Sequence, residues 1–420
     1  MASATQAKLQ APADLESETE IESARVAVTS APAGQLRLTI HEELEALEQD
    51  WRAFQEHADC TVFQSFEWLS AWQRNVGARI GARPLIVAGR EPSGQLAFLF
   101  PLMIEPGRLA RRLRWLGSDL CDYNAPMLAP DYSDRHAAGF HSHWREILDR
   151  LRGRSDWNYD LIDLEKMPET VGPQANPFLR LGPSVHPRGA YLTTLTGDWD
   201  SYYTGKRSSA TRRRDRTKRN RLGDLGEVKF VNPGSMAELN GTLDTLMVQK
   251  ARALAEMGAV NIFALPGYPE FFRELATAPQ TRELVHVSRL DVGSIPAAIN
   301  LGVVFRGCYY HILASYEDGE TARFGPGVAH LHDLLRYAID RKCQIFDFTI
   351  GDERYKRDWY DIEKALYDYV AIASLRGGIA AAPVLVLRRL KNRIRQNEKM
   401  LDWAKQMRAR FGALTARWRG

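Results

Sequence analysis

The segment that decides the fold is Arg323-Phe-Gly-Pro-Gly-Val328, which stands between a strand-like run and a helix-like run. The strand-like run is Tyr309–Tyr316, and apolar residues recur at helical spacing after the segment, at Leu331, Leu334, Leu335, Ala338 and Ile339. Glycines let backbone N–H groups approach an anion closely, and the first turn of a helix offers unpaired donors at the positive end of its dipole. The segment therefore predicts a site for a pyrophosphate, with a simple turn before a helix as the alternative.

The strands around this segment are of the antiparallel type. Leu284–Val292, Ile295–Phe305 and Tyr309–Tyr316 predict a meander, Ile345–Ile350 predicts a strand after the helix, and Ala365–Ala373 is expected to complete the same domain. A dinucleotide-binding loop or a Walker loop instead follows a parallel strand of a β-α-β unit. The Gly-Lys-Ser/Thr sequence of nucleotide hydrolases is also absent from the loop.

Several short motifs follow one another here: Phe324-Gly-Pro-Gly-Val328, Ala338-Ile339, Phe346-Asp-Phe348, Gly351-Asp-Glu-Arg-Tyr-Lys356 and Trp359. Together they resemble the C-terminal signature of the CelD/BcsL-like acetyltransferases, also known as the BioF2-like acetyltransferase domain. That group belongs to the GNAT superfamily and is related to the Fem peptidyltransferases. The resemblance implies an α/β fold of two tandem GNAT-like domains with mixed, mostly antiparallel sheets. It also implies an acyl-CoA site in the second domain and an acceptor near the cleft between the two.

The cofactor contacts that this resemblance implies lie in the glycine loop, at Arg323, Phe324, Gly325, Pro326, Gly327 and Val328. The usual loop of the superfamily reads Gln/Arg-x-x-Gly-x-Gly/Ala, whereas Arg323 stands two residues before Gly325. The first half has no comparable glycine loop before its predicted helix, Asp134–Arg150. We therefore expect the first half to be free of cofactor and to shape the acceptor cleft.

Acyl transfer from a thioester needs donors for the oxyanion, a base for the acceptor and an acid for the leaving thiolate. Asp352 and Glu353, just past a strand end, are candidate bases, Tyr355 is a candidate acid, and Lys356 is a candidate to neutralise the acceptor or the cofactor. A solvated, salt-bridged turn is the alternative explanation for the charged residues. His311 is a further candidate base, although a lone histidine on a strand is more often structural. Because no nucleophile elbow is visible, we expect direct attack without an acyl-enzyme.

The run from Lys206 to Arg221 contains nine basic residues and one acidic residue. A surface helix with one solvated face is the simplest interpretation. Contact with an anionic acceptor or a CoA phosphate is a second interpretation. Contact with tRNA is a third, because Fem relatives use aminoacyl-tRNA.

Length and composition favour two globular domains. The chain has 420 residues, of which 45% are hydrophobic and 26% charged. We expect domains at 35–188 and 189–375 and a disordered acidic arm at 1–34. The four cysteines are widely spaced, which argues against a disulfide framework or a metal site and favours the cytoplasm. No apolar run reaches the roughly 18 residues of a membrane-spanning helix.

The segment Pro383–Gly420 predicts a basic amphipathic helical tail. It carries a formal charge of +9, so the rest of the chain carries −5, because the whole chain is at +4. One face is apolar from end to end, so the tail could dock on the protein, pair with a second chain or lie on an anionic membrane. Nucleic acid is not expected as the main partner of such a chain.

These observations predict an acyl-CoA-dependent acyltransferase that uses acetyl-CoA or a longer thioester. The expected acceptor is an amine or hydroxyl of a sugar, exopolysaccharide or cell-envelope precursor. A Fem-like transferase that depends on aminoacyl-tRNA and a non-catalytic scaffold of an envelope biosynthesis complex are the two alternatives.

Overall fold

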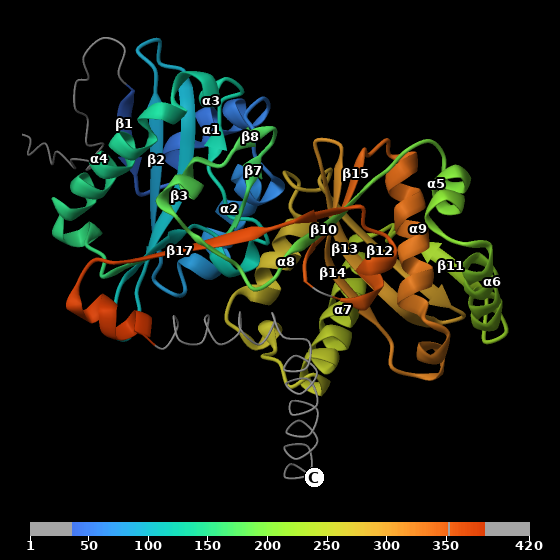
Figure 1. Cartoon of the computed structure of the whole chain (residues 1–420). Helices are drawn as coiled ribbons and strands as arrows, with labels where there is room; N and C mark the ends of the chain where they lie inside the picture. Colours follow the sequence, from blue (N-terminus) through green and yellow to red (C-terminus); the bar gives the residue numbers. More distant parts are fainter. Residues whose placement is uncertain (1–35, 352, 383–420) are drawn as a thin grey trace, which may run out of the picture.

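Two mixed sheets stand side by side in the computed structural model, which describes residues 36–351 and 353–382 (Figure 1). The first sheet has eight strands in the order β1-β2-β3-β4-β6-β17-β9, with β5 paired to β3. Its strands are β1 (Arg37–His41), β2 (Arg83–Arg90), β3 (Leu96–Glu105), β4 (Arg112–Trp115), β5 (Met127–Leu128), β6 (Leu161–Pro168), β9 (Ser184–Val185) and β17 (Leu366–Ile372). A separate two-stranded sheet is formed by β7 (Thr170–Val171) and β8 (Gln174–Ala175).

The second sheet has seven strands in the order β11-β12-β13-β14-β15-β10-β16. Its strands are β10 (Ala190–Thr194), β11 (Val228–Val231), β12 (Val285–Val292), β13 (Ile295–Phe305), β14 (Cys308–Tyr316), β15 (Ile345–Ile350) and β16 (Ile362–Lys364). The predicted meander β12–β14 is confirmed, with antiparallel pairing throughout. Each large sheet contains one parallel pair, β4 with β6 and β14 with β15, so both sheets are mixed and mostly antiparallel as expected.

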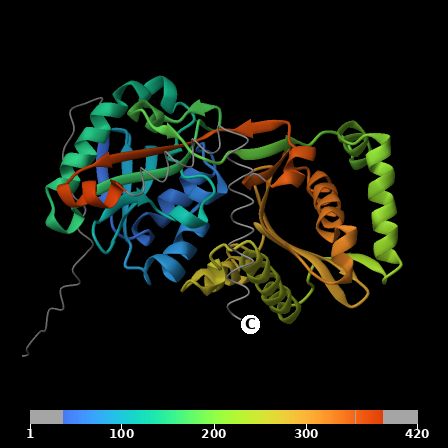
Figure 2. The ribbon, with the colours of Figure 1, turned by 60° about the horizontal axis from the view of Figure 1, so that its bottom comes forward.

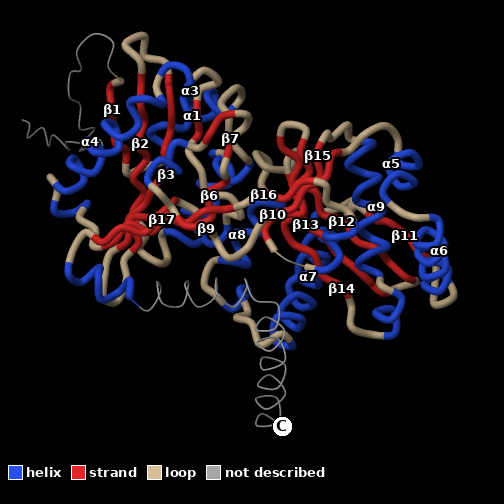
Figure 3. The backbone as a smooth tube through the Cα atoms, viewed as in Figure 1, coloured by secondary structure: helices blue, strands red, loops and turns tan. Residues whose placement is uncertain are grey.

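Helices pack around both sheets (Figure 3). In the first half they are α1 (Glu48–Gln55), α2 (Phe66–Trp72), α3 (Tyr132–Arg135) and α4 (Phe140–Arg152), and in the second half α5 (Trp199–Lys206), α6 (Ser209–Gly223), α7 (Met236–Glu256), α8 (Tyr268–Thr277) and α9 (Pro326–Asp340). Ser235 and Glu238 stand at the spacing of a capping box, which predicts the start of a helix. The structure confirms this start for α7, because the Ser235 hydroxyl accepts the Glu238 N–H at 3.2 Å. The helix predicted from Asp134 is instead divided into α3 and α4 by a short 3₁₀ turn at Ala137–Gly139.

The strand expected over Ala365–Ala373 exists, but the prediction that it completes the second sheet was wrong. β17 joins the first sheet, where it pairs with β6 over most of its length and with β9 at its start. Its Tyr367 and Tyr369 pack on the core of the first half. An apolar run identifies a strand but not its partner, because pairing is decided by long-range packing. β17 therefore runs from the second half back to the first (Figures 1 and 2).

One apolar core continues from the first half into the second. Trp68 of α2 meets Phe271 of α8 edge-on, with ring centroids 5.2 Å apart. Phe63 contacts Tyr310 of β14 in the same way, at 5.8 Å. Buried aromatic pairs of this kind add to the energy of area burial. The two halves are thus packed together at the place where the second sheet opens.

Both predicted terminal segments, the acidic arm at 1–34 and the basic tail at 383–420, lie outside the described residues. Residues 375–382 are helical and precede the tail. Within the described ranges, no helix is both long and apolar enough to cross a membrane.

Candidate functional site

The parallel strands β14 and β15 separate after a short paired stretch. They pair only at Cys308 with Ile345, Tyr309 with Phe346 and Tyr310 with Asp347. Beyond this stretch β14 continues to Tyr316 and β15 continues to Ile350. We call the opening between residues 311–316 and 348–350 the fork. Strand edges that lose their partner expose backbone donors and acceptors, so the fork offers an edge on which an extended ligand can lie.

Two irregularities of the backbone lie at the fork. The register of β13 and β14 shifts between Leu301 and Gly302, which leaves Ile312 without an opposite residue. Thr349 has a φ of 60°, a left-handed conformation that is rare for a β-branched residue. Bulges and strained residues concentrate at functional sites, so both features mark the fork as a candidate site.

The predicted glycine loop lies at the open end of the fork. Gly325 has a φ of 67° and precedes α9, whose first residue is Pro326. A Cβ added at Gly325 would meet no atom within 4 Å, and one at Gly327 would meet Tyr316 Cδ1 at 3.8 Å. The loop is therefore open to space, and the last residue of β14 contacts it. β14 thus runs from the fork, where Ile312 bulges, to Tyr316 beside the loop.

The backbone amides of the loop differ in whether they already donate a hydrogen bond. Pro326 has no N–H, and the N–H groups of Gly325 and Val328 donate to the carbonyls of Ala322 and Gly325 at 3.0 and 3.1 Å. In the described part of the chain, no backbone carbonyl accepts from Gly327. The Gly327 amide is thus the loop donor that points to an anion site most directly.

The side chains beside the loop contribute less than the sequence suggests. Arg323 is exposed, pairs with Glu320 at 2.6 Å, and holds its guanidinium 4.8 Å from the centre of the Phe324 ring. Phe324 and Val328 are half-buried, whereas Pro326 is buried. Arg323 would have to leave Glu320 to reach a phosphate.

Two lysines lie on the two arms of the fork. Lys356 Nζ donates to the carbonyls of Thr349 and Ile350 at 3.2 and 3.1 Å and pairs with Glu353 at 2.9 Å. Lys250 of α7 donates to the Ala314 carbonyl at 3.1 Å. Burial lowers the pKa of Lys250, partly opposed by the charge of Glu353. The fork therefore contains two ammonium groups, of which Lys250 was not predicted.

The other candidate catalytic residues of the second half gather at the fork. Burial raises the pKa of Glu353, but the charge and hydrogen bond of Lys356 outweigh it and bring the pKa below its ordinary value. The Tyr355 ring lies 6.4 Å from His311, and burial raises the pKa of its hydroxyl, which stays protonated. Asp352 lies outside the described residues. The structure thus brings Glu353, Tyr355, Lys356 and His311 together.

His311 is a buried, neutral imidazole. Burial, with the charges of Lys356 and Lys250, lowers its pKa to about 3. The Asn300 amide, oriented to accept from the Tyr309 hydroxyl, places its NH₂ group 3.1 Å from His311 Nε2. This environment favours a neutral hydrogen-bonding role over proton abstraction near pH 7.

The first half contributes two residues that sequence reasoning missed, Asp122 and Tyr123. The Tyr123 hydroxyl donates to both oxygens of Asp347, at 2.7 and 2.9 Å. Burial raises the pKa of Asp122, and the opposing effects of Lys166, of a hydrogen bond with Thr349 and of Lys356 do not cancel it. Both residues follow Cys121 in an irregular segment without periodicity. Only the folded chain brings them to the fork.

The Asp347 carboxyl makes the packing of the two halves depend on pH. Burial raises its pKa to about 6, against the hydrogen bonds from Tyr123 and Thr349. Because this pKa lies above that of the unfolded chain, the stability it confers is complete at low pH and is lost as the pH rises through about 6. Relative to Asp347→Asn, we expect the wild-type free energy of unfolding to fall by about 2 kcal/mol between about pH 4 and about pH 7. Urea unfolding of both proteins measures this, and a difference that does not change with pH would contradict it.

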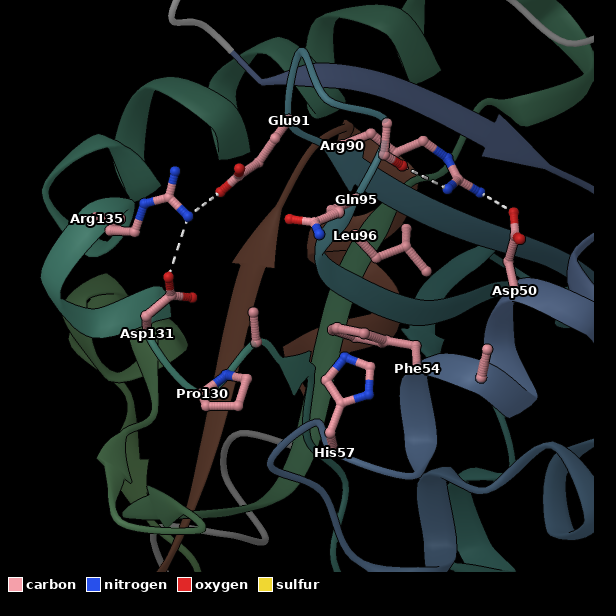
Figure 4. Close-up of a pocket in the computed structure, with 13 residues that line it drawn as sticks. Asp50, Phe54, His57, Arg90, Glu91, Gln95, Leu96, Pro130, Asp131 and Arg135 are labelled. Atoms are coloured by element: carbon pink, nitrogen blue, oxygen red, sulfur yellow. Dashed lines mark hydrogen bonds and ion pairs between the residues drawn. The ribbon is translucent and has the colours of Figure 1, made fainter.

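A separate open depression of about 550 Å³ lies in the first half, between α1, the β2–β3 turn and α3 (Figure 4). Arg135 lies between Glu91 and Asp131, at 2.6 and 3.0 Å, and Arg90 pairs with Asp50. The arginines of this depression thus pair with neighbouring carboxylates and are not free to bind an anionic ligand. Over the described ranges of the chain, no group of three or more His, Cys, Asp or Glu side chains could hold a metal ion.

A family model matches the part of the chain that contains these residues. Residues 209–357, which include the fork and the glycine loop, match the family model described as an acetyltransferase (GNAT) domain. No curated protein sequence matches the chain. The match confirms a GNAT-type acyltransferase domain in this part of the chain, as the motifs suggested.

Several solved structures are similar to this chain. The chain is similar to FemX, with a TM-score of 0.51 and 10% identity over 80% of this chain and 98% of FemX. It is also similar to L-PGS from Bacillus licheniformis, with a TM-score of 0.45 and 12% identity over 86% of this chain and 99% of that one. A tandem GNAT protein from the clavulanic acid biosynthesis pathway gives a TM-score of 0.43 and 12% identity over 80% and 98% of the two chains. The likeness to FemX confirms an α/β fold with two mixed sheets.

Proposed function

We propose that this chain transfers an acyl group from acetyl-CoA or a longer acyl-CoA to an amine or hydroxyl of a sugar, exopolysaccharide or cell-envelope precursor. The observation that carries the proposal is that β14 extends from the fork to Tyr316, which lies beside Gly327 of the glycine loop. A phosphate at the Gly327 amide would place an extended thioester arm along β14, with its carbonyl in the fork. The acceptor class rests on the resemblance of the C-terminal motifs.

In the proposed reaction, the acceptor nitrogen or oxygen attacks the thioester carbonyl carbon. A new C–N or C–O bond forms, the C–S bond breaks, and the acceptor proton passes to Asp122. Tyr355 donates its proton to the leaving thiolate and regains one through solvent. We propose Asp122 rather than Glu353 as the base, because the raised pKa of Asp122 makes it the stronger proton acceptor.

Lys250 is proposed to stabilise the oxyanion. Among the described residues its ammonium donates to one acceptor, the Ala314 carbonyl, whereas Lys356 donates to three. Lys250 therefore keeps N–H groups for charge that develops in the transition state. Lys356, held by Thr349, Ile350 and Glu353, fixes the end of β15 and supplies positive charge.

We expect Lys250→Met to lower kcat at least about tenfold, and Glu353→Gln to lower it less than about tenfold. The lysine would act mainly in the transition state, whereas the glutamate would position Lys356. Stopped-flow detection of the released thiol, with the acceptor saturating, measures both variants. A larger loss for Glu353→Gln would return the role of base to Glu353.

The overall proposal is tested by incubating the chain with acetyl-, octanoyl- and hexadecanoyl-CoA and a panel of amino sugars and glycan precursors. Thiol release that depends on the acceptor, with the acylated product identified by mass spectrometry, supports it. Activity that requires charged tRNA and is lost with ribonuclease would favour the Fem-like alternative. Failure to bind any thioester would favour a scaffold.

A further inference from the structure

The outer face of α6 carries an exposed row of basic side chains. We define the outer basic row as Arg213, Arg214, Arg216 and Lys218, all of which are exposed. Helix α6 stands at the outer edge of the second half, beyond α9 (Figures 1 and 2). Over the residues that the structure describes, no carboxylate lies within ion-pair distance of these side chains, although neighbouring basic residues of the same helix are paired. A row of unpaired, like charges on one helix costs repulsion, which an anionic partner would relieve.

The inner face of α6 is neutralised and packed. Arg219 pairs with Asp333 of α9 at 3.0 Å, and Arg207, just before the helix, pairs with Asp358 at 3.1 Å. Leu222 is fully buried in a core cluster that contains Ala329, from the first turns of α9. Helix α6 is thereby fixed beside the glycine loop, with its charge balanced on that side and unbalanced on the solvent side.

The paired inner face and the unpaired outer face of α6 suit ligands of different size. A CoA nucleotide bound at the loop would lie close to the inner face, where Arg207 and Arg219 already have partners. The outer basic row faces solvent along a helix of 15 residues, which is about 22 Å long. The row itself runs from Arg213 to Lys218, about 8 Å along the helix axis. Four exposed cations over that length exceed what one phosphate group can pair with, so the row fits an acidic protein surface better than a single phosphate.

We propose that the outer basic row docks an acidic, helical carrier protein that delivers the acyl group as a phosphopantetheine thioester. The phosphate of the arm would sit at the Gly327 amide and the thioester in the fork, so this inference rests on the proposed function. The reaction is unchanged in its balance. The bond between the acyl carbon and the carrier's sulfur breaks, and a bond between the acyl carbon and the acceptor forms. The acceptor loses one proton, and the carrier's thiolate gains one.

An acidic protein fits the row better than a nucleic acid does. Residues Ser209–Gly223 contain no aromatic side chain on which a base could stack. Outside the tail at 383–420 the chain carries a net charge of −5. Its basic surface on α6 is therefore small, whereas binding to RNA usually uses basic residues that contact many phosphates. Charge complementarity of this kind acts mainly on the rate of association.

The test compares the double charge reversal Arg213→Glu/Arg216→Glu with the matched double variant Arg108→Glu/Arg145→Glu. The control pair is exposed on the first half and carries the same change in charge. Each protein receives octanoyl-CoA or the octanoyl form of an acidic acyl carrier protein. We expect the α6 variant to lose at least about tenfold in kcat/KM with the carrier and to stay within about twofold with octanoyl-CoA. The control should stay within about twofold with both donors.

The other outcomes overturn the proposal in distinguishable ways. Equal losses with both donors would mean that the row contacts the CoA nucleotide. Absence of carrier activity in the wild type, with octanoyl-CoA still active, would overturn the docking proposal but keep the proposed function. Inactivity with every donor would overturn both. Selective loss of RNA binding in the α6 variant, with carrier activity intact, would assign the row to nucleic acid.

Discussion

Replacing Asp122 by Asn is expected to lower kcat at least about 100-fold while leaving the affinity for the acyl donor within about twofold. The substitution keeps the shape of the side chain and its hydrogen-bonding capacity toward Thr349, but it removes the proton acceptor. General base catalysis typically contributes about 10²- to 10⁴-fold to a rate, which sets the size of the loss. Single-turnover thiol release measures kcat, and calorimetry with the donor measures affinity.

The pH profile gives the same prediction a second readout. Because Asp122 must be ionised to act, the rate should fall as the pH drops through its pKa, which lies above that of an exposed aspartate. This acid limb should disappear in Asp122→Asn. Asp149→Asn, at an exposed carboxylate of α4, is the matched control and should keep both rate and limb. An unchanged acid limb in Asp122→Asn would place the base elsewhere in the fork.

The glycine loop and the strands around it could be predicted because their signals are local. Left-handed backbone at Gly325, the helix that follows and the meander before it each depend on a few neighbouring residues. The capped start of α7 at Ser235 belongs to the same class. The helix α8 (Tyr268–Thr277) was not predicted, because its apolar residues serve the contact between the halves, as Phe271 against Trp68 shows.

The remaining parts of the site depend on contacts between distant segments. Asp122 and Tyr123 reach the fork only when the halves pack together, and no periodicity marks them in advance. The predicted sheet of β17 was wrong for the same reason. Pairing of β17 with β6 joins residues about 200 positions apart, such as Val370 with Asp163. The sequence could thus place candidate residues on elements but could not decide their charge states, such as the neutral imidazole of His311.

The second large effect is expected at the loop, where Gly327→Trp should weaken donor binding at least about 100-fold, or about 2.7 kcal/mol. A Cβ at Gly327 meets only Tyr316, at the ordinary distance of 3.8 Å, so the backbone can accept a side chain. Because Gly327 lies in the first turn of α9, substitution there carries no left-handed strain. The indole would instead occupy the space in front of the amide that we assign to the donor phosphate.

Gly241→Trp on α7 is the matched control, because a Cβ there meets no atom within 4 Å and the residue is exposed. Both variants should unfold at the wild-type urea concentration, whereas only Gly327→Trp should lose binding of octanoyl-CoA in calorimetry. The loss should be the same for acetyl-CoA, since the phosphate and not the acyl chain is displaced. Wild-type affinity in Gly327→Trp would contradict the assignment of the donor phosphate to the loop. The acyl donor would then have to reach the fork without contact to the Gly327 amide.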